Sequence, residues 1–413
     1  MKFVSHRRRR IAVRAHYAKR EVSHILKHGR SGALILGLAA AAAVAVPAAA
    51  SASTGAATTG ASPVVGHVYV DDNTAGTNTI GAFDRHADGT LTPEAGSPFA
   101  AGGGGTGAGL ASQGALQISP DGRFLIAADA GSNQISVLRI RGNGSVKLVH
   151  DGVVSSGGVL PVSVAIHGDL VYVANSGNGG SNYTGFRLGR NGRLEPIAGS
   201  AVALPDGSQP GDVLFNGDGT KLAGTRVGTS QIDSFTVGSG GLLTAAPGSP
   251  FPAQGLGPFG SEFRPTSPGQ LFVSNAHNTG TGTVSAFADS ADGTLTSIGS
   301  SPFADNQTAP CWVEISHDGQ FLFTVNTGSG TISRYSIAPD GTLTLLGSTP
   351  VGATGGVGAV DARLSPDGRT LFVDESRIGA VGAFAVNGGT LTELASSPTS
   401  LPVGATPAGI VVT

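Results

Sequence analysis

Cysteine is almost absent from this sequence, which contains only Cys311 among 413 residues. An internal disulfide is therefore impossible, and no CxxC motif exists for a redox or zinc site. The HExxH helix of zinc proteases and the Gly-x-Ser-x-Gly elbow of serine hydrolases are missing as well. These absences exclude the commonest sequence-readable catalytic sites, and the sequence predicts neither a bound metal nor a cofactor.

Positive charge is scarce outside the first fifty residues. The chain has 25 Lys+Arg and 27 Asp+Glu, and residues 1–50 hold 10 of the basic and 1 of the acidic residues. The rest therefore has 15 basic and 26 acidic residues, a net charge of −11, and its only lysines are Lys147 and Lys221. Nucleic-acid binding needs clustered Lys and Arg to neutralise phosphates, so we expect no nucleic-acid partner.

The N-terminal segment has the pattern of a secretory signal peptide. A basic stretch containing His6–Arg10 precedes an apolar run, Ala33–Val46, and an Ala-x-Ala cleavage region. A resident membrane helix needs about 20 apolar residues, so this run predicts no resident membrane span. We assign residues 1–52 to the signal peptide and 53–65 to a flexible linker. A secreted, extracellular or cell-envelope location follows, by either the general secretory or the twin-arginine route.

A short phrase recurs about every fifty residues through the remainder. Its seven copies are "DGTLT" at 88–92, 292–296 and 340–344, "NGSVK" at 143–147, "NGRLE" at 191–195, "GGLLT" at 240–244 and "GGTLT" at 388–392. Between copies, segments such as "SPDGRFLIAAD" (119–129) read as two strands joined by an Asp-Gly turn. Each unit thus contains four strands, named a to d from the inside outward, and one large apolar position of strand c is expected to pack sheet against sheet.

Seven such units predict an all-β fold, a seven-bladed β-propeller over residues 66–413. The first unit begins with strand b and the chain ends with "PAGIVVT" (407–413), which matches strand a. The C-terminal strand should therefore pair into the N-terminal blade and close the ring. The glycine-rich stretch "AGGGGTGAG" (101–109) leads into no helix and is interpreted as a loop rather than a phosphate cradle. We expect a monomer.

The b strands carry "YVDD" (69–72), "YVAN" (172–175), "FVSN" (272–275) and "FTVN" (323–326). With "SPDGRFL" and "DGTLT", these repeats resemble the seven-bladed lactonase family, which includes 6-phosphogluconolactonase and carboxymuconate-lactonising enzymes. The resemblance implies a small-molecule lactone substrate. The Arg-His pair of that family is absent here. Its Asn-Glu position holds Thr225 and Arg226, and its Asn-Arg-Gly-His position reads Asn275, Ala276, His277, Asn278.

Polar residues end all seven b strands, where a propeller gathers its loops on one face. Asn175, Asn275 and Asn326 are candidate ligand-binding residues there, although Asn at such positions also stabilises turns. Arg226 and Glu375 break the repeat, as do the following residues His277 and Arg377. His277 or Glu375 is the candidate general base, and Arg226 or Arg377 the candidate carboxylate clamp.

Three functions remain open. The chain could be a lactonase-like enzyme acting on a sugar-acid or muconate-type lactone. It could instead be a non-catalytic propeller that binds an extracellular ligand, namely a glycan, a peptide or a cell-wall component. The third is a structural envelope module. Glu262, Glu314 and Arg363 on strands a should line the central channel, either as structural ion pairs or as ligand contacts, and Cys311 is more typical of an inert buried thiol than of a nucleophile.

Overall fold

Tight Asp-Gly turns connect the inner strands of the blades. In four of these turns the glycine has a φ between 68° and 70°, a left-handed conformation that favours glycine: Gly122, Gly219, Gly319 and Gly368. In three of them a serine two residues before the Asp caps the turn. For example, Ser119 donates its hydroxyl to Asp121 Oδ1 at 2.7 Å and accepts the amide of Phe124 at 3.0 Å. The local sequence thus determines where strands a and b reverse.

The computed structural model describes residues 62–277, 280–352 and 358–413. The predicted signal peptide (1–52) and most of the predicted linker (53–65) lie outside these residues, and the first strand already begins at Val64. The chain divides into two units, Met1–Thr59 and Gly60–Thr413, and only the second is described. A search of the described residues for a helix long and apolar enough to span a bilayer finds none.

Seven antiparallel sheets make up the described unit, and the first four contain the following strands. Blade 1 contains β33 (Gly409–Val412), β1 (Val64–Asp71), β2 (Gly76–His86), β3 (Leu91–Pro93) and β4 (Phe99–Gly105). Blade 2 contains β5 (Leu116–Ile118), β6 (Phe124–Asp129), β7 (Gln134–Ile140) and β8 (Val146–Ser155). Blade 3 contains β9 (Pro161–His167), β10 (Leu170–Asn175), β11 (Asn182–Leu188), β12 (Leu194–Pro196) and β13 (Val202–Ala203). Blade 4 contains β14 (Pro210–Phe215), β15 (Lys221–Arg226), β16 (Gln231–Val237), β17 (Leu243–Ala245) and β18 (Phe251–Pro252).

The remaining three sheets follow the same order. Blade 5 contains β19 (Pro258–Arg264), β20 (Ser267–Asn275), β21 (Thr283–Asp289), β22 (Leu295–Ser297) and β23 (Phe303–Ala304). Blade 6 contains β24 (Pro310–Ile315), β25 (Phe321–Asn326), β26 (Thr331–Ile337) and β27 (Leu343–Pro350). Blade 7 contains β28 (Ala359–Leu364), β29 (Thr370–Glu375), β30 (Ala380–Asn387), β31 (Thr390–Glu393) and β32 (Thr399–Ser400). The outer strand d is continuous in blades 2 and 6 and is split into two short strands in the other five.

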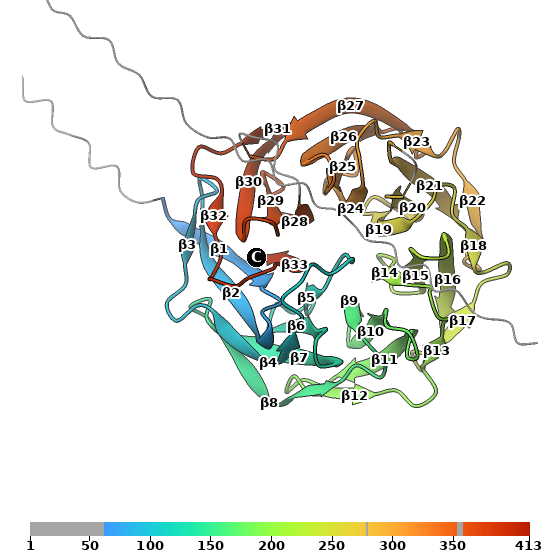
Figure 1. Ribbon diagram of the computed structural model, residues 1–413. Coiled ribbons are helices and arrows are strands. Elements are labelled where there is room, and N and C mark those ends of the chain that lie inside the picture. Colours follow the sequence, from blue (N-terminus) through green and yellow to red (C-terminus); the bar gives the residue numbers. More distant parts are fainter. Residues whose placement is uncertain (1–61, 278–279, 353–357) are drawn as a thin grey trace, which may run out of the picture. The chain divides into compact units, whose positions relative to one another are not determined.

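The seven sheets are arranged as blades around a channel (Figure 1), which confirms the predicted propeller. The C-terminal strand β33 pairs antiparallel with β1, from Val68 opposite Val412 to Asp71 opposite Gly409. The guanidinium of Arg85 on β2 holds the end of the chain by donating to the carbonyl of Thr413 from Nε at 3.0 Å and Nη2 at 2.9 Å. The first and last segments of the described unit therefore form one blade, as the sequence predicts.

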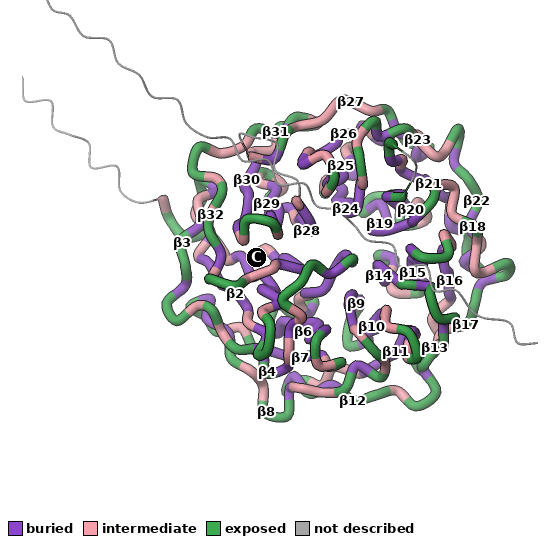
Figure 2. Tube along the Cα trace, in the orientation of Figure 1, coloured by how far each residue is buried: buried purple, intermediate pink, exposed green. Residues whose placement is uncertain are grey.

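The core lies between blades, where the faces of neighbouring sheets meet. Figure 2 shows buried residues concentrated on the inner strands and exposed residues on the turns. The large apolar position of strand c is at most 4% exposed in every blade, in agreement with its predicted packing role: Phe83, Leu138, Phe186, Phe235, Phe287, Tyr335 and Phe384. Because each blade buries both faces against its neighbours, the ring has to close for blades 7 and 1 to be covered.

Ile410 tests this closure, because its fully buried side chain packs in the cluster that joins β33 and β1 to blade 7. We expect Ile410→Ala to lower the free energy of unfolding by about 2–4 kcal/mol, the usual cost of a large-to-small change in a core. Val403, nearby in sequence and fully exposed, provides the control, since Val403→Ala should change stability by less than about 0.5 kcal/mol. Chemical denaturation measures the free energy of unfolding of both variants. Equal losses of stability would contradict the role of β33 in closing the ring.

Candidate functional site

A segment of blade 2 crosses the channel and divides it. Residues 106–114 precede β5, and Gln113 donates from Nε2 to the carbonyls of Ser261 at 3.1 Å and Val313 at 3.2 Å, on blades 5 and 6. The indole of Trp312 donates to the carbonyl of Ser112 at 2.6 Å. The channel therefore has two separate ends, one on each face of the ring.

The glycine-rich stretch that leads into this segment is more ordered than its sequence indicates. Its first part is strand β4, which pairs with β2. A Cβ on Gly103 would lie 2.2 Å from Asp129 Oδ2, and one on Gly105 would lie 2.4 Å from the backbone of Asn73. The glycines permit close packing against blades 1 and 2, so the interpretation as a loop holds only for the part after Gly105.

A cavity of about 360 Å³ lies beside the crossing segment. It opens among the starts of strands a and the ends of strands b, a face named here the b-end face. Apolar lining predominates, and the polar members are Thr106, Ser176, Gln209 and His277. Of the residues that line the cavity, His277 alone is titratable. Phe259 contributes an aromatic wall and stacks edge-on against Trp312, with ring centroids 5.4 Å apart.

Two of the lining residues occupy a backbone conformation that recurs around the ring. The residue before the first residue of strand a has a left-handed φ in five blades: Leu160 (57°), Gln209 (47°), Gly257 (64°), Ala309 (54°) and Gly358 (101°). Non-glycine residues rarely adopt this conformation and pay a strain energy for it. At Leu160 and Gln209 it positions side chains that line the cavity.

His277 is placed by backbone contacts at the end of β20. Its amide donates to the carbonyl of Leu256 at 3.0 Å, and the preceding amide of Ala276 donates to Gly257 at 2.9 Å. The imidazole is exposed and reaches the cavity. The candidate base predicted from the sequence is thus available to a ligand.

The three predicted asparagines are buried inside their own blades. In each, the amide Nδ2 donates to two side chains on the neighbouring strand c. Asn175 contacts Asn182 at 2.8 Å and Thr184 at 3.2 Å. Asn275 contacts Thr283 at 3.0 Å and Ser285 at 2.8 Å, and Asn326 contacts Thr331 at 3.0 Å and Ser333 at 2.9 Å. The structure thus gives these residues contacts that join strand b to strand c.

Arg226 is also engaged within its blade. Its guanidinium contacts Asp233 through two charge-assisted hydrogen bonds, from Nε to Oδ2 at 2.6 Å and from Nη2 to Oδ1 at 2.5 Å. Tyr183 of blade 3 donates to the same carboxylate at 3.0 Å. Arg226 is 8% and Asp233 1% exposed, so the pair lies inside the protein, and Arg226 does not line the cavity.

Glu375 occupies the equivalent position in blade 7 without the equivalent partners. Ala380 lies opposite it and Gly382 lies two residues further along β30, so the hydroxyls found in other blades are missing. Its Oε1 is buried without a hydrogen-bond partner, in a space that a Cβ on Gly382 would enter at 2.7 Å. Burial, with a smaller contribution from Glu393, raises the pKa of Glu375 to about 7.

His277 and Glu375 belong to blades 5 and 7, with blade 6 between them, and only His277 lines the cavity. Arg377 is exposed on the turn after β29. The structure therefore brings His277 together with the polar residues of the cavity, and it gives Arg226, Glu375 and Arg377 separate surroundings.

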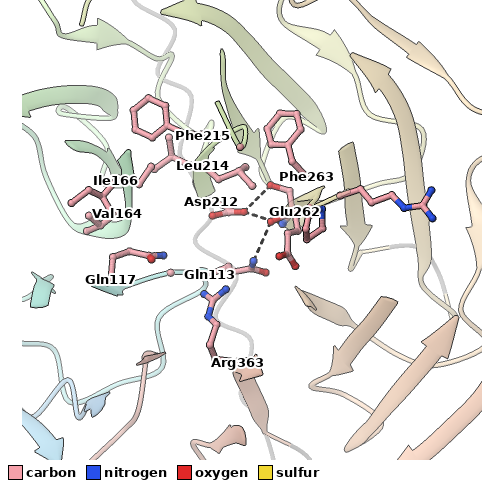
Figure 3. A pocket seen from close by; sticks show the side chains of 17 residues that line it. Gln113, Gln117, Val164, Ile166, Asp212, Leu214, Phe215, Glu262, Phe263 and Arg363 are labelled. Carbon is pink, nitrogen blue, oxygen red and sulfur yellow. Dashed lines mark hydrogen bonds between the residues drawn. The ribbon is translucent and has the colours of Figure 1, made fainter. Parts of the chain in front are cut away.

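A second cavity, of about 340 Å³, occupies the opposite end of the channel (Figure 3). Its polar lining consists of Gln113, Gln117, Asp212, Ser261, Glu262, Arg264 and Arg363. Burial raises the pKa of Asp212 to about 7 and that of Glu262 well above the usual range.

Arg363 forms an ion pair with Glu314 at 3.1 Å, and Glu314 also accepts the amide of Leu364 at 2.8 Å. For Glu314 and Arg363 these contacts correspond to the first alternative, a structural ion pair. Glu262, the third predicted channel charge, lines the second cavity and forms no ion pair with another described residue.

Cys311 is buried on β24 and lines neither of these cavities. Burial raises the pKa of its thiol to about 11, so it is not a thiolate at neutral pH. Among the described residues, one trio of side chains could hold a metal ion: His67, Asp84 and Glu94 of blade 1, whose ligand atoms all lie within 4.8 Å of one another. None of these residues lines either cavity.

A family model for "Lactonase, 7-bladed beta-propeller" matches residues 77–215 and 263–407. The chain belongs to this lactonase family. No curated protein matches the sequence.

The solved structures most useful for comparison share the fold at low sequence identity. A 6-phosphogluconolactonase candidate from Bacteroides uniformis has a TM-score of 0.68 at 21% identity, covering 84% of this chain and 99% of that one. The periplasmic gluconolactonase of Pseudomonas aeruginosa has a TM-score of 0.66 at 17% identity, covering 84% and 98%. Hydrazine synthase from Kuenenia stuttgartiensis has a TM-score of 0.54 at 17% identity, covering 77% and 90%. These likenesses establish the fold and leave the reaction open.

Sequence reasoning missed most of the residues that line the cavity of this lactonase-family protein. Phe259 and Gln209 flank prolines that begin strands a, and the recurrence of those prolines was the available signal. Thr106 and Ser176 belong to no recognisable sequence motif. Their positions depend on how the crossing segment packs over three blades, which no local pattern encodes.

The ion pair of Arg226 generates a stability prediction. Arg226→Gln leaves Asp233 buried without its charge partner, so the free energy of unfolding should fall by about 3–5 kcal/mol. Adding Asp233→Asn should recover more than half of that loss, because the orphaned charge is removed. Arg377→Gln, at an exposed position, should change stability by less than about 0.5 kcal/mol. Urea denaturation of the four proteins is the measurement, and a negligible effect of Arg226→Gln would contradict the structural role.

The raised pKa of Glu375 predicts a pH effect. A folded-state pKa near 7 means that the native protein holds this proton more tightly than the unfolded chain, whose glutamate pKa is about 4.3. The contribution to stability is therefore full below about pH 4 and is lost as the pH rises to about 7.

Glu375→Gln has no carboxyl group to titrate at this position, so this loss of stability does not occur. Between pH 5 and pH 8 the free energy of unfolding of the variant should therefore fall by about 1–3 kcal/mol less than that of the parent protein. Glu195→Gln removes an exposed carboxylate and should leave the parent profile unchanged. Parallel pH profiles for all three proteins would contradict the assignment.

Proposed function

We propose that this protein is a secreted or cell-envelope lactonase that hydrolyses an uncharged sugar-acid lactone in the cavity on the b-end face. Membership of the lactonase family supports the class of substrate. The observation that carries the proposal is that His277, an accessible imidazole, reaches an otherwise uncharged cavity at the end of β20. Its volume of about 360 Å³ lies within the range typical of small-molecule sites.

In this reaction His277 acts as the general base. The imidazole accepts a proton from a water molecule as the water oxygen forms a bond to the lactone carbonyl carbon. The bond from that carbon to the ring oxygen then breaks, and the proton passes from the imidazolium to the departing alkoxide. The product is the open hydroxy acid. The amide of Gln209 and the hydroxyls of Ser176 and Thr106 are the lining groups able to hydrogen-bond the lactone oxygens.

The absence of charge from the lining favours an uncharged lactone. No arginine, lysine or carboxylate lines this cavity. Arg226 is committed to Asp233, and Arg377 lies on another blade. A phosphorylated or carboxylated lactone would enter a mostly apolar space without a cation to pair with it, at a large desolvation cost. A neutral sugar lactone needs only hydrogen-bond partners.

Binding without catalysis is the second candidate function, and one observation favours it. No carboxylate lines the cavity to orient the His277 imidazole or to stabilise the imidazolium. A glycan bound by the same hydroxyl and amide groups, against the apolar wall of Phe259, would need no such partner. The ligand would then be recovered unchanged.

Hydrolysis of a panel of neutral and carboxylated lactones, followed by proton release, separates these functions. For a neutral lactone, we expect kcat/KM to fall by about 100-fold or more in His277→Ala, the usual loss when a general base is removed. His317→Ala provides the matched control, since His317 lies on an exposed turn between β24 and β25 and lines neither cavity described above. Its activity should stay within about twofold of the parent.

Two results would overturn the proposed reaction. If every lactone is hydrolysed no faster than in buffer, the enzyme assignment fails, and a thermal stabilisation by neutral oligosaccharides would then support the binding function. If a lactone is hydrolysed equally well by His277→Ala, the active site lies elsewhere in the protein.

A further inference from the structure

A hollow of about 490 Å³ on the outer side of blades 2 and 3 is rich in basic side chains. It is formed by the β7–β8 hairpin and the turn between β11 and β12. Its lining consists of Arg139, Arg141, Lys147, Leu148, Val149, His150, Asn191 and Arg193. No acidic residue lines it, although the chain beyond residue 50 has a net charge of −11.

The basic residues of the chain are concentrated at this place. Of the 15 Lys and Arg beyond residue 50, seven lie between Arg123 and Arg193. On the β7–β8 hairpin, Arg139 lies directly opposite Lys147, and both are exposed. Like charges directly opposite on a sheet destabilise it. Arg141 extends the row, because its amide donates to Ser145 across the same hairpin at 2.9 Å. An arrangement that costs stability points to a use for the charge.

Two buried basic residues inside other blades are compensated by carboxylates, whereas the buried Arg85 and Arg264 donate to backbone carbonyls. Arg226 pairs with Asp233 at 2.5 Å, and Lys221 pairs with Asp289 at 2.9 Å. At the edge of the hollow, Arg193 and His150 share Asp151, at 3.2 and 3.1 Å.

Arg139, Arg141 and Lys147 make no ion pair with an acidic residue in the described part of the chain. Three positive charges therefore remain available to a ligand.

The guanidinium of Arg139 is held in place before any ligand arrives. Its central carbon lies 4.6 Å from the centroid of the Phe124 ring, and its Nη2 donates to the carbonyl of Asn191 at 3.4 Å. A planar guanidinium fixed in this way loses little freedom on binding, and its remaining N–H groups match the geometry of phosphate oxygens.

We propose that this hollow binds a soluble ligand carrying two or more phosphate groups. Three uncompensated cations match the charge of a short oligophosphate, and the arginine forks suit its oxygens. A bilayer is disfavoured, because Leu148 and Val149 are only partly exposed and no large exposed hydrophobic side chain belongs to the hollow. Long polyanions such as nucleic acid are repelled by the acidic remainder of the protein.

Titration calorimetry of the protein with sodium triphosphate tests the proposal. We expect one site, with an affinity that weakens roughly tenfold when NaCl is raised from about 50 to about 200 mM, because salt screens the attraction between the phosphates and the basic side chains. Arg139→Gln/Lys147→Gln should weaken binding by about tenfold or more, because two charged contacts are lost.

The control is Arg369→Gln/Arg377→Gln, which removes the same charge from exposed positions on blade 7 and should leave the affinity within about twofold. Absence of triphosphate binding, equal weakening in both double variants, or binding to anionic phosphatidylserine vesicles in its place would each overturn the proposal. Circular dichroism of the variants excludes loss of fold as the cause.

Discussion

Every other feature of this molecule depends on the pairing of β33 with β1, because that pairing closes the ring. A blade has two apolar faces, and each has to be covered by a neighbour. Closure lets blade 7 bury Phe372 and Val381 against Val68 and Val70 of blade 1. It also fixes the channel across which residues 106–114 reach blades 4, 5 and 6, since Gln113 contacts the backbone of Gly211, Ser261 and Val313. The cavity at His277 exists only because this segment is held in place.

The polar face of the propeller contains fewer free functional groups than its residue types indicate. Asparagine amides at the ends of b strands donate hydrogen bonds to hydroxyls of strand c, and Arg226 forms an ion pair with Asp233. In blade 7 the same position holds an acid facing Ala380 and Gly382, so its oxygen is left unpartnered. A buried polar group needs a partner, and the repeat supplies one in most blades. His277, two residues past Asn275, lies outside that repeat, and its exposed imidazole lines the cavity.

The sequence predicts most of the fold, because local sequence patterns that recur from blade to blade determine it. Asp-Gly turns, a large apolar residue on strand c and the missing strand a of the first unit lead to seven blades and to the closing strand. The candidate site is predicted in part. His277 stands out because it breaks the repeat, and Arg226 stands out for the same reason. Arg226 is a structural arginine rather than a ligand-binding one because Asp233, seven residues later on strand c, is placed to pair with it. Phe259, Gln209 and Thr106 converge through tertiary packing and carry no pattern of their own.

Histidine NMR during titration with a δ-lactam of a neutral sugar acid tests most directly whether ligands enter the cavity beside His277. The lactam keeps the shape of the lactone and resists hydrolysis. We expect the ring signals of His277 to shift in proportion to occupancy. The signals of His167, the last residue of β9, and of His317, on the turn between β24 and β25, should stay unchanged, because neither residue lines the cavity. A lactam that binds and leaves the His277 signals unmoved would contradict ligand binding in this cavity.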